Sequence, residues 1–155
     1  MTMPTSHRLQ ITRWFDSPPE KVFKAWTDPE ALKVFHAPAD AFSVPTVEVD
    51  LRVGGHYRIE MRAPDGSTHI ATGAYREIRP PDRLVFTWSW EKGGTPDGSP
   101  DDSGETVVTL ELRKKENGTE LALTHDLFPA VEQQERHLHG WTGIVHRLEG
   151  FLRSA

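Results

Sequence analysis

The chain has 155 residues, of which 36% are hydrophobic and 26% are charged, which allows one domain with a buried core and is too short for two ordinary domains. The 18 Lys and Arg against 23 Asp and Glu give a net charge of -5, and neither sign collects into the stripe that a phosphate-binding face needs, so we expect no nucleic-acid partner. The absence of Cys excludes disulfides, thiolate nucleophiles and Cys-ligated metals.

The sequence also bears on location in the cell. The first residues, MTMPTSHRLQ, lack an apolar segment behind a basic one, so no secretory signal peptide is predicted. No apolar stretch approaches the about 20 residues that a membrane-spanning helix requires. We therefore expect a soluble cytoplasmic protein with no membrane span.

A strand and two short helices are predicted at the start of the chain. In HRLQITRWF, Leu9, Ile11 and Phe15 share one face of a strand and Trp14 lies on the other. The next helix is predicted to have Ser17 as its N-cap, Pro18 at its first position and Glu20 as the capping-box acid, and a second helix is predicted to have Asp28 as its cap before Pro29. The apolar stripe of the first helix consists of Val22, Phe23 and Trp26.

The segment VEVDLRVGGHYRIEM, residues 47–61, predicts a β-hairpin. Directly opposed residues of a hairpin share a face, so we expect Val53 to oppose Tyr57 and Leu51 to oppose Ile59. Residues 54–56, Gly-Gly-His, then form a three-residue loop with a bulge, where Gly tolerates positive φ.

Further strands are predicted from residue 69 to residue 125. Gly73 inside HIATGAYREI indicates a bulge or a close backbone approach. RLVFTWSW places Leu84, Phe86, Trp88 and Trp90 on one face of its strand. ETVVTLELR and TELALTH complete an antiparallel meander, and the polar, acidic loop from Glu91 to Gly104 has no periodicity.

The chain is predicted to end in a long helix with one buried face. Apolar residues recur there at steps of three and four, which is the period of an amphipathic helix. The only large apolar surface on which this helix can pack is the inner face of the sheet, so the predicted fold class is α+β, a curved antiparallel sheet wrapped around the C-terminal helix. The buried stripe consists of Leu138, Trp141, Ile144, Val145, Leu148 and Leu152.

This order of elements resembles the helix-grip domain of the START-like superfamily. The residues are more specifically similar to the family of domains homologous to the C-terminal part of the activator of Hsp90 ATPase. The resemblance rests on ITRWFDSPPEKVFKAWTDPEALKVF, VDLRVGGHYRIEM, the Asp65-Gly66 turn, IRPPDRLVFTW, GTELALTH and HGWTGIVHRLEGFL, in that order. It implies a single domain over residues 8–152, with residues 1–7 as a flexible N-terminal tail.

The chain departs from the family pattern at Phe35-His36-Ala37-Pro38, where the family usually has Trp before a Gly-Pro or Ala-Pro step. The superfamily includes lipid carriers, hormone receptors and aromatic-ring cyclases, so the resemblance implies a fold more firmly than an activity.

A helix held by a curved sheet usually leaves a cavity where the two diverge, and such cavities bind small molecules. The inward-facing residues of the predicted sheet and helix are the candidates for lining it, although the same residues could simply form a packed core. These candidates are Tyr57, Met61, Tyr75, Phe86, Trp88, Trp90, His125, Trp141 and Val145.

No motif for a catalytic, metal or cofactor site stands out. His139 and His146 lie two helical turns apart, too far to chelate one ion, so no metal is expected. His125 shares the inward face of its strand, where a satisfied core histidine competes with a ligand-contacting one. The strand carboxylates alternate opposite the apolar residues and are expected on the solvated face, and we predict no catalytic residue and no cofactor.

Three functions remain open from the sequence. The first is binding of a small hydrophobic or aromatic molecule, with the loop from Glu91 to Gly104 near the mouth of the cavity. The second, implied by the resemblance, is a stress-response module that interacts with an Hsp90-type chaperone. The third is a polyketide cyclase-like enzyme that uses His125 or a tyrosine as acid or base. Either a monomer or a homodimer is compatible with the pattern.

Overall fold

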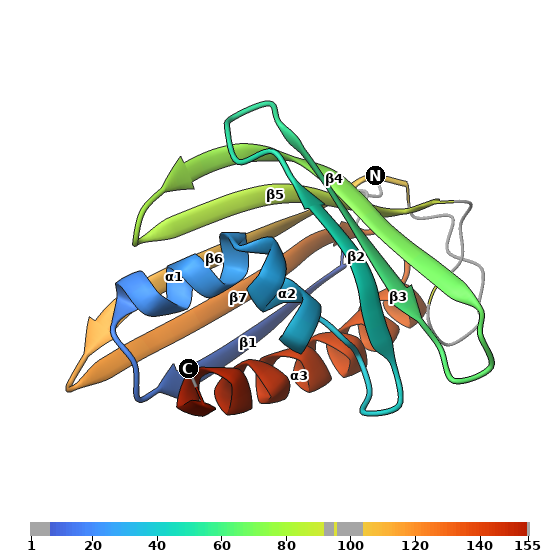
Figure 1. Cartoon of the computed structure of the whole chain (residues 1–155). Coiled ribbons are helices and arrows are strands. Elements are labelled where there is room, and N and C mark those ends of the chain that lie inside the picture. Colours follow the sequence, from blue (N-terminus) through green and yellow to red (C-terminus); the bar gives the residue numbers. More distant parts are fainter. Residues whose placement is uncertain (1–6, 92–94, 96–103, 155) are drawn as a thin grey trace, which may run out of the picture.

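The computed structural model describes residues 7–91, 95 and 104–154. One antiparallel sheet in the order β1-β7-β6-β5-β4-β3-β2 curves around the long helix α3, and α1 and α2 lie against the same concave side (Figure 1). This arrangement confirms the predicted α+β helix-grip fold. The elements are β1 (His7–Phe15), α1 (Pro19–Thr27), α2 (Pro29–Phe35), β2 (Ser43–Val49), β3 (His56–Arg62), β4 (Thr68–Arg79), β5 (Arg83–Trp90), β6 (Thr106–Lys115), β7 (Gly118–Phe128) and α3 (Val131–Ser154).

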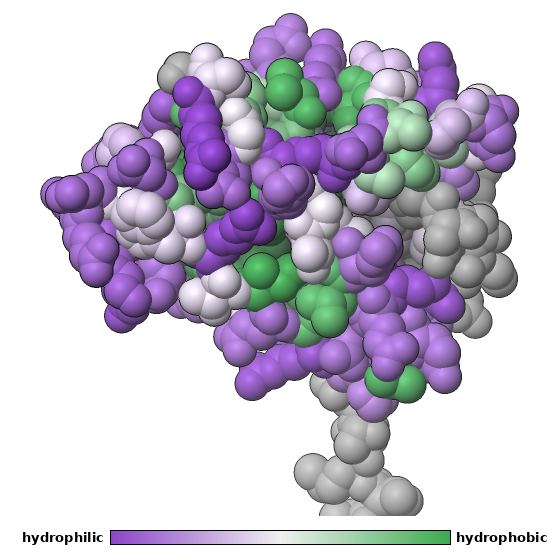
Figure 2. Space-filling model, turned by 90° about the horizontal axis from the view of Figure 1, so that it is seen from below, coloured by the Kyte–Doolittle hydropathy of each residue, from purple (hydrophilic) through white to green (hydrophobic). Residues whose placement is uncertain are grey.

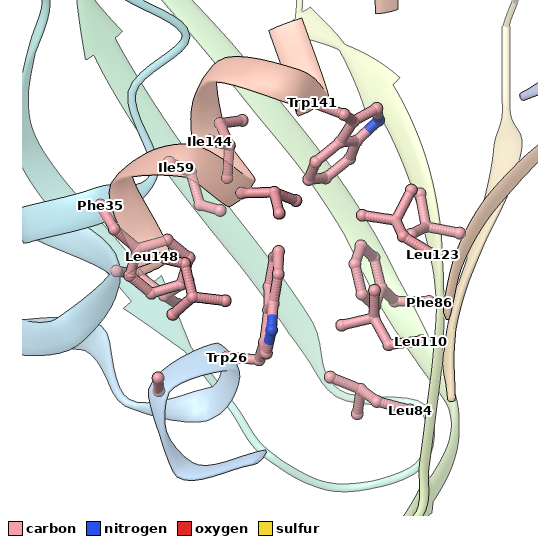
Figure 3. Close-up of a cluster of buried hydrophobic side chains, with 14 of the residues drawn as sticks. Trp26, Phe35, Ile59, Leu84, Phe86, Leu110, Leu123, Trp141, Ile144 and Leu148 are labelled. Carbon is pink, nitrogen blue, oxygen red and sulfur yellow. The ribbon is translucent and has the colours of Figure 1, made fainter. Parts of the chain in front are cut away.

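The hydrophobic core lies between the concave face of the sheet and the three helices. Trp26 of α1, Trp141 of α3 and Phe86 of β5 meet there, beside Leu110 and Leu123 of the neighbouring strands (Figure 3). All five side chains are buried. The alternation predicted for the strands therefore gives the correct inward face.

The start of α1 differs from the prediction. Ser17 is not the N-cap, because Pro18 occupies that position with extended backbone angles and α1 begins at Pro19. A proline disfavours the helical conformation of the residue before it. Pro19 therefore keeps Pro18 extended, and the helix begins one residue later than predicted. Ser17 is buried instead, and its carbonyl oxygen accepts a hydrogen bond from the Thr119 hydroxyl at 2.7 Å. The predicted cap of α2 is confirmed: the Asp28 carboxylate accepts a hydrogen bond from the Glu30 amide.

The register of the β2–β3 hairpin also differs from the prediction. Val49, not Val53, opposes Tyr57, and Val47 opposes Ile59. The connection spans residues 50–55, and Val53 is 63% exposed.

The Gly pair shapes this connection. Gly54 has the positive φ predicted for it, 87°. The Gly54 amide donates to the Tyr75 carbonyl at 2.8 Å, and the Tyr75 amide donates to the Gly55 carbonyl at 2.9 Å. The predicted three-residue loop is wrong because the connection forms these backbone bonds with β4.

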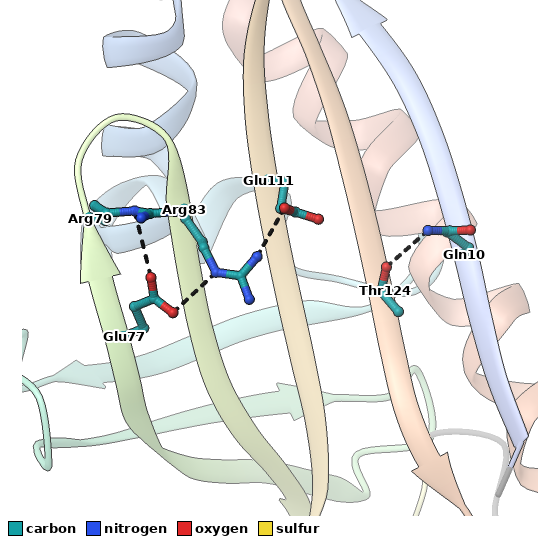
Figure 4. A network of polar contacts seen from close by, with 6 residues as sticks. All are labelled: Gln10, Glu77, Arg79, Arg83, Glu111 and Thr124. Carbon is teal, nitrogen blue, oxygen red and sulfur yellow. Dashed lines mark hydrogen bonds and ion pairs between the residues drawn. The ribbon is translucent and has the colours of Figure 1, made fainter.

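Gly73 of β4 confirms the predicted close backbone approach. A Cβ atom there would lie 1.9 Å from the Thr87 carbonyl oxygen of β5, so no larger residue fits. Polar side chains on the opposite, convex face of the sheet form ion pairs between strands. Arg83 bridges Glu77 and Glu111, as Figure 4 shows.

Helix α3 buries most of the predicted stripe, but Leu138 is 38% exposed and His137 is buried at 7% in its place. Consecutive residues are about 100° apart around a helix, so position 137 lies nearer than 138 to the centre of the stripe around Trp141. The surface on the α3 side is mostly hydrophilic, with hydrophobic residues in small groups (Figure 2). No helix within the described residues is long and apolar enough to cross a membrane.

Strand β1 begins at His7, one residue before the start that the resemblance implies for the domain. The other residues of the predicted tail, 1–6, lie outside the described residues.

Candidate functional site

A cleft of about 510 Å³ lies between the N-terminal half of α3 and the sheet. Its volume falls within the range of about 300–1,000 Å³ that is typical of small-molecule sites. Met61, Trp88, Trp90, Trp141 and Ile144 form its apolar wall. The other residues that line it are Pro38, Thr95, Glu132, Glu135, Arg136, His137, His139 and Gly140.

The structure divides the predicted lining residues among three environments. Met61, Trp88, Trp90 and Trp141 line the cleft. His125 and Val145 are fully buried and line neither the cleft nor a second, smaller void. The remaining three, Tyr57, Tyr75 and Phe86, line a separate void of about 20 Å³ between the sheet and the two short helices.

Sequence reasoning missed several residues of the cleft. His137 carried a usable signal, because it lies four residues before Trp141 and so on the same helical face. Glu132 and Glu135 are exposed at the rim and carried no such signal. The loop from Glu91 to Gly104 was predicted near the mouth: its Thr95 is buried and lines the cleft, while residues 92–94 and 96–103 lie outside the described residues.

A hydrogen-bonded chain of side chains crosses the core behind the cleft. The Trp141 indole Nε1 donates to His125 Nδ1 at 2.9 Å, and His125 Nε2 lies 2.6 Å from the Thr106 hydroxyl. That hydroxyl donates to the Trp88 carbonyl oxygen at 2.9 Å, so it must accept from His125 Nε2–H. We call Trp141 and His125 the buried pair. Both ring nitrogens of His125 have partners, which is the geometry of a satisfied core histidine.

Burial lowers the pKa of His125 well below its ordinary value, and the neighbouring His137 lowers it further. The hydrogen bonds from Trp141 through His125 to Thr106 require a neutral His125 ring, because its Nδ1 must keep a lone pair to accept from Trp141. His125 is 0% exposed. It therefore has no access to a molecule in the cleft, and its geometry gives no support to the prediction that it acts as an acid or base.

A second tryptophan–histidine hydrogen bond lies in the wall of the cleft itself. His137 Nδ1 lies 2.7 Å from the Gln133 carbonyl oxygen, which can only accept, so Nδ1 carries the proton. His137 Nε2 then has a lone pair and accepts from the Trp90 indole Nε1 at 2.9 Å. We call Trp90 and His137 the cleft pair. Its imidazole ring lies 5.2 Å, centroid to centroid, from that of His125.

His36 lies among three tryptophans, one of which is Trp141 of the buried pair. Its ring stacks on Trp88 at 5.8 Å and meets the edges of Trp141 at 5.5 Å and Trp26 at 6.4 Å. Burial lowers the pKa of His36 to about 4. Within the described residues, His36 Nδ1 and the indole nitrogens of Trp26 and Trp88 are buried without a hydrogen-bond partner. This residue belongs to the Phe35–Pro38 segment that departs from the family pattern.

The segment after His36 forms one edge of the cleft. Pro38 lines it, and the Pro38 carbonyl oxygen packs so closely on α3 that a Cβ atom at Gly143 would lie 2.3 Å away. The Asp40 carboxylate forms an ion pair with Arg147, whose guanidinium also donates to the Gly143 carbonyl at 2.9 Å. Glycine at 143 thus allows the close approach that positions this edge.

The described side chains contain no group of three or more His, Asp or Glu residues that could hold a metal ion. The described residues offer a molecule in the cleft an apolar wall, the cleft pair, the Thr95 hydroxyl, the His139 imidazole and a charged rim.

Comparison with solved structures gives close matches over almost the whole chain. Protein CV1439 from Chromobacterium violaceum is 26% identical with a TM-score of 0.80, covering 94% of this chain and 97% of its own. A protein from Rhodobacter sphaeroides is 27% identical with a TM-score of 0.78, covering 95% and 93%. The AHSA1 protein from Silicibacter pomeroyi is 25% identical with a TM-score of 0.79, covering 95% and 98%.

A search of curated proteins found no match. The family model described as Activator of Hsp90 ATPase homolog 1-like protein matches residues 16–153, which include α1, the whole cleft wall and all but the last residue of α3. The order of elements, the structural matches and this family match agree. The chain therefore belongs to the Activator of Hsp90 ATPase homolog 1-like family, within the START-like superfamily.

Proposed function

We propose that this protein binds a small hydrophobic or aromatic molecule in the cleft between α3 and the sheet. The observation that carries the proposal is the volume of about 510 Å³ beside an apolar wall of three tryptophans, Met61 and Ile144. Indole rings supply large contact areas and lose little conformational entropy on binding. The bound molecule would bury its apolar surface there and leave polar groups towards the rim.

Native mass spectrometry of the freshly purified protein is the first test. We expect an additional mass of a few hundred daltons, on the order of the ligands that such clefts enclose, which disappears on denaturation. Titration of the unloaded protein with lipids and polycyclic aromatics should then quench tryptophan fluorescence with saturation. A bare mass together with no saturable quenching by any of these compounds would contradict the proposal.

A cleft-filling substitution tests the location. Gly140 lines the cleft, and a Cβ atom there meets only the Pro38 Cβ, at 3.9 Å, so Gly140→Leu adds a side chain to the cleft without a backbone collision. We expect it to abolish quenching. The matched control is Gly150→Leu on the same helix, where a Cβ atom meets nothing within 4 Å. Equal binding by both variants would place the ligand elsewhere.

The family match favours a second candidate, interaction with an Hsp90-type chaperone as part of a stress response. We expect the chain to change the ATPase rate of a bacterial Hsp90 if this candidate holds. No change at saturating protein would count against it. Cytoplasmic localisation, which both candidates assume, stays a prediction.

A further inference from the structure

The apolar wall of the cleft contains one hydrogen bond whose two ends have fixed roles. Trp90 Nε1 can only donate, and His137 Nε2 can only accept because His137 Nδ1–H is committed to the Gln133 carbonyl. Both side chains line the cleft, and Trp90 is only half-buried. A ligand that enters beside them therefore meets a donor and an acceptor that bind each other at 2.9 Å and that must move apart to bind a ligand atom between them.

A hydroxyl group complements this pair. Its oxygen accepts from Trp90 Nε1–H, and its hydrogen is donated to His137 Nε2, so one hydrogen bond is replaced by two and neither protein atom loses a partner. We propose that the natural ligand is an apolar or aromatic molecule with a hydroxyl group, and that the cleft pair binds this hydroxyl. This inference rests on the proposed function and names the chemical class of its ligand.

Other polar groups fit the pair less well. An ether or ketone oxygen accepts from Trp90 but leaves His137 Nε2 without a donor, and an unpartnered buried acceptor is costly. A carboxylate places a negative oxygen against the His137 lone pair, and of the charged side chains that line the cleft two, Glu132 and Glu135, repel it while one, Arg136, attracts it. Sites built to bind a substrate hydroxyl discriminate strongly against analogues that lack it.

The buried pair cannot play the same role. His125 is 0% exposed and both its nitrogens are engaged, with Trp141 and with the Thr106 hydroxyl. A ligand hydroxyl would have to break a closed chain to reach it. The selectivity for a hydroxyl is therefore assigned to the cleft pair alone.

The test uses three probes of nearly equal shape: 2-naphthol, naphthalene and 2-methoxynaphthalene, titrated into the purified full chain by isothermal calorimetry. We expect 2-naphthol to bind about ten-fold more tightly than either of the others, the effect of one hydrogen bond gained without an unpartnered atom. Equal affinities for the three would overturn the hydroxyl assignment and leave the proposed function standing. Binding of none would overturn the proposed function as well.

Two variants and a control assign the effect to the pair. His137→Leu removes the acceptor, and we expect 2-naphthol to bind no more tightly than 2-methoxynaphthalene. Trp90→Phe removes the donor and lets water bind His137 Nε2, so a ligand hydroxyl only replaces this water and the ratio of naphthol to naphthalene affinity should fall, whatever the smaller ring does to the affinity of both probes. His139→Leu changes an exposed histidine of the cleft outside the pair and should keep the wild-type ratio. An unchanged ratio in either pair variant would overturn the proposal.

Discussion

Two tryptophan–histidine hydrogen bonds join α3 to the sheet, and both are 2.9 Å long. In the buried pair, Trp141 of α3 donates to His125 of β7; in the cleft pair, Trp90 of β5 donates to His137 of α3. The pairs differ in their surroundings. The hydrogen bond of the buried pair continues through the Thr106 hydroxyl to the Trp88 carbonyl, and only the Trp141 ring of this pair reaches the cleft of about 510 Å³, whereas both residues of the cleft pair line it.

The same tryptophan–histidine hydrogen bond can therefore stabilise the fold in one environment and bind a ligand in another. A hydrogen bond closed off from water and from ligands fixes a single arrangement of its elements, because each lost partner leaves an unsatisfied polar atom. A hydrogen bond at a cleft can exchange its partner for a ligand atom. We therefore expect changes in the buried pair to alter the free energy of unfolding most, and changes in the cleft pair to alter binding.

The largest effect is expected for Trp141→Phe. The substitution leaves a void in the core and removes the donor to His125 Nδ1, so the free energy of unfolding should fall by about 3 kcal/mol. Urea denaturation followed by circular dichroism measures it. The control is Trp14→Phe, because Trp14 is 41% exposed and donates only to the Lys115 carbonyl, and its loss should stay below about 1 kcal/mol. Similar losses in the two variants would refute the contrast.

The second-largest effect is expected from lowering the pH, which should reduce the free energy of unfolding through the buried His36. The pKa of His36 is lowered to about 4, so the unfolded chain binds a proton from about pH 6.5 downward while folded His36 stays neutral. The stability is thus full above pH 6.5 and is lost as the pH falls towards 4, by about 3 kcal/mol for this group. His125, with its pKa also lowered, adds a loss of the same sign.

His36→Phe isolates the part due to His36. The difference in unfolding free energy between the variant and the wild type, followed by urea denaturation from pH 7 to about pH 4, should shift in favour of the variant as the pH falls. His146→Phe, at an exposed position of α3, is the control for loss of a histidine. If the unfolding free energy of His36→Phe depends on pH as it does in the wild type, His36 does not cause the loss of stability at low pH.

The sequence was sufficient for the elements and their inward faces, because alternation in the strands and the helical period report burial directly. It was insufficient where distant segments decide the local structure. The β2–β3 register depends on backbone bonds between Gly54, Gly55 and Tyr75, and no pattern within the hairpin encodes them. The start of α1 was predictable in principle, since Pro19 restricts Pro18.

The candidate site shows the same limit. Alternation placed Phe86 and Trp88 on one face of β5, yet Trp88 lines the cleft and Phe86 lines the separate small void. The pattern of a strand gives the face of a residue but not which part of a crossing helix lies above it. His36 is buried in the core although it is the C-cap of α2, a position that the helical period of apolar residues does not cover.

A substitution that disturbs the packing of α3 on the Pro38 segment, without changing either pair, should have an intermediate effect on the free energy of unfolding. Gly143→Ala places a Cβ atom 2.3 Å from the Pro38 carbonyl oxygen, so we expect a loss of about 2 kcal/mol in unfolding free energy despite the better helix propensity of Ala. Gly150→Ala meets nothing within 4 Å and should instead gain up to about 1 kcal/mol. A gain in both variants, measured by thermal denaturation, would show that the Pro38 segment yields easily.

The smallest effect on stability is expected for Trp90→Phe, and it completes the contrast with Trp141→Phe. Trp90 is half-buried beside the cleft, so water can reach His137 Nε2 when the indole donor is removed, and the loss should be at most about 1 kcal/mol. Urea denaturation under the conditions used for Trp141→Phe gives the comparison. A loss as large as that of Trp141→Phe would mean that the cleft pair holds α3 on the sheet as firmly as the buried pair, and a hydrogen bond needed for folding could not be released to a ligand.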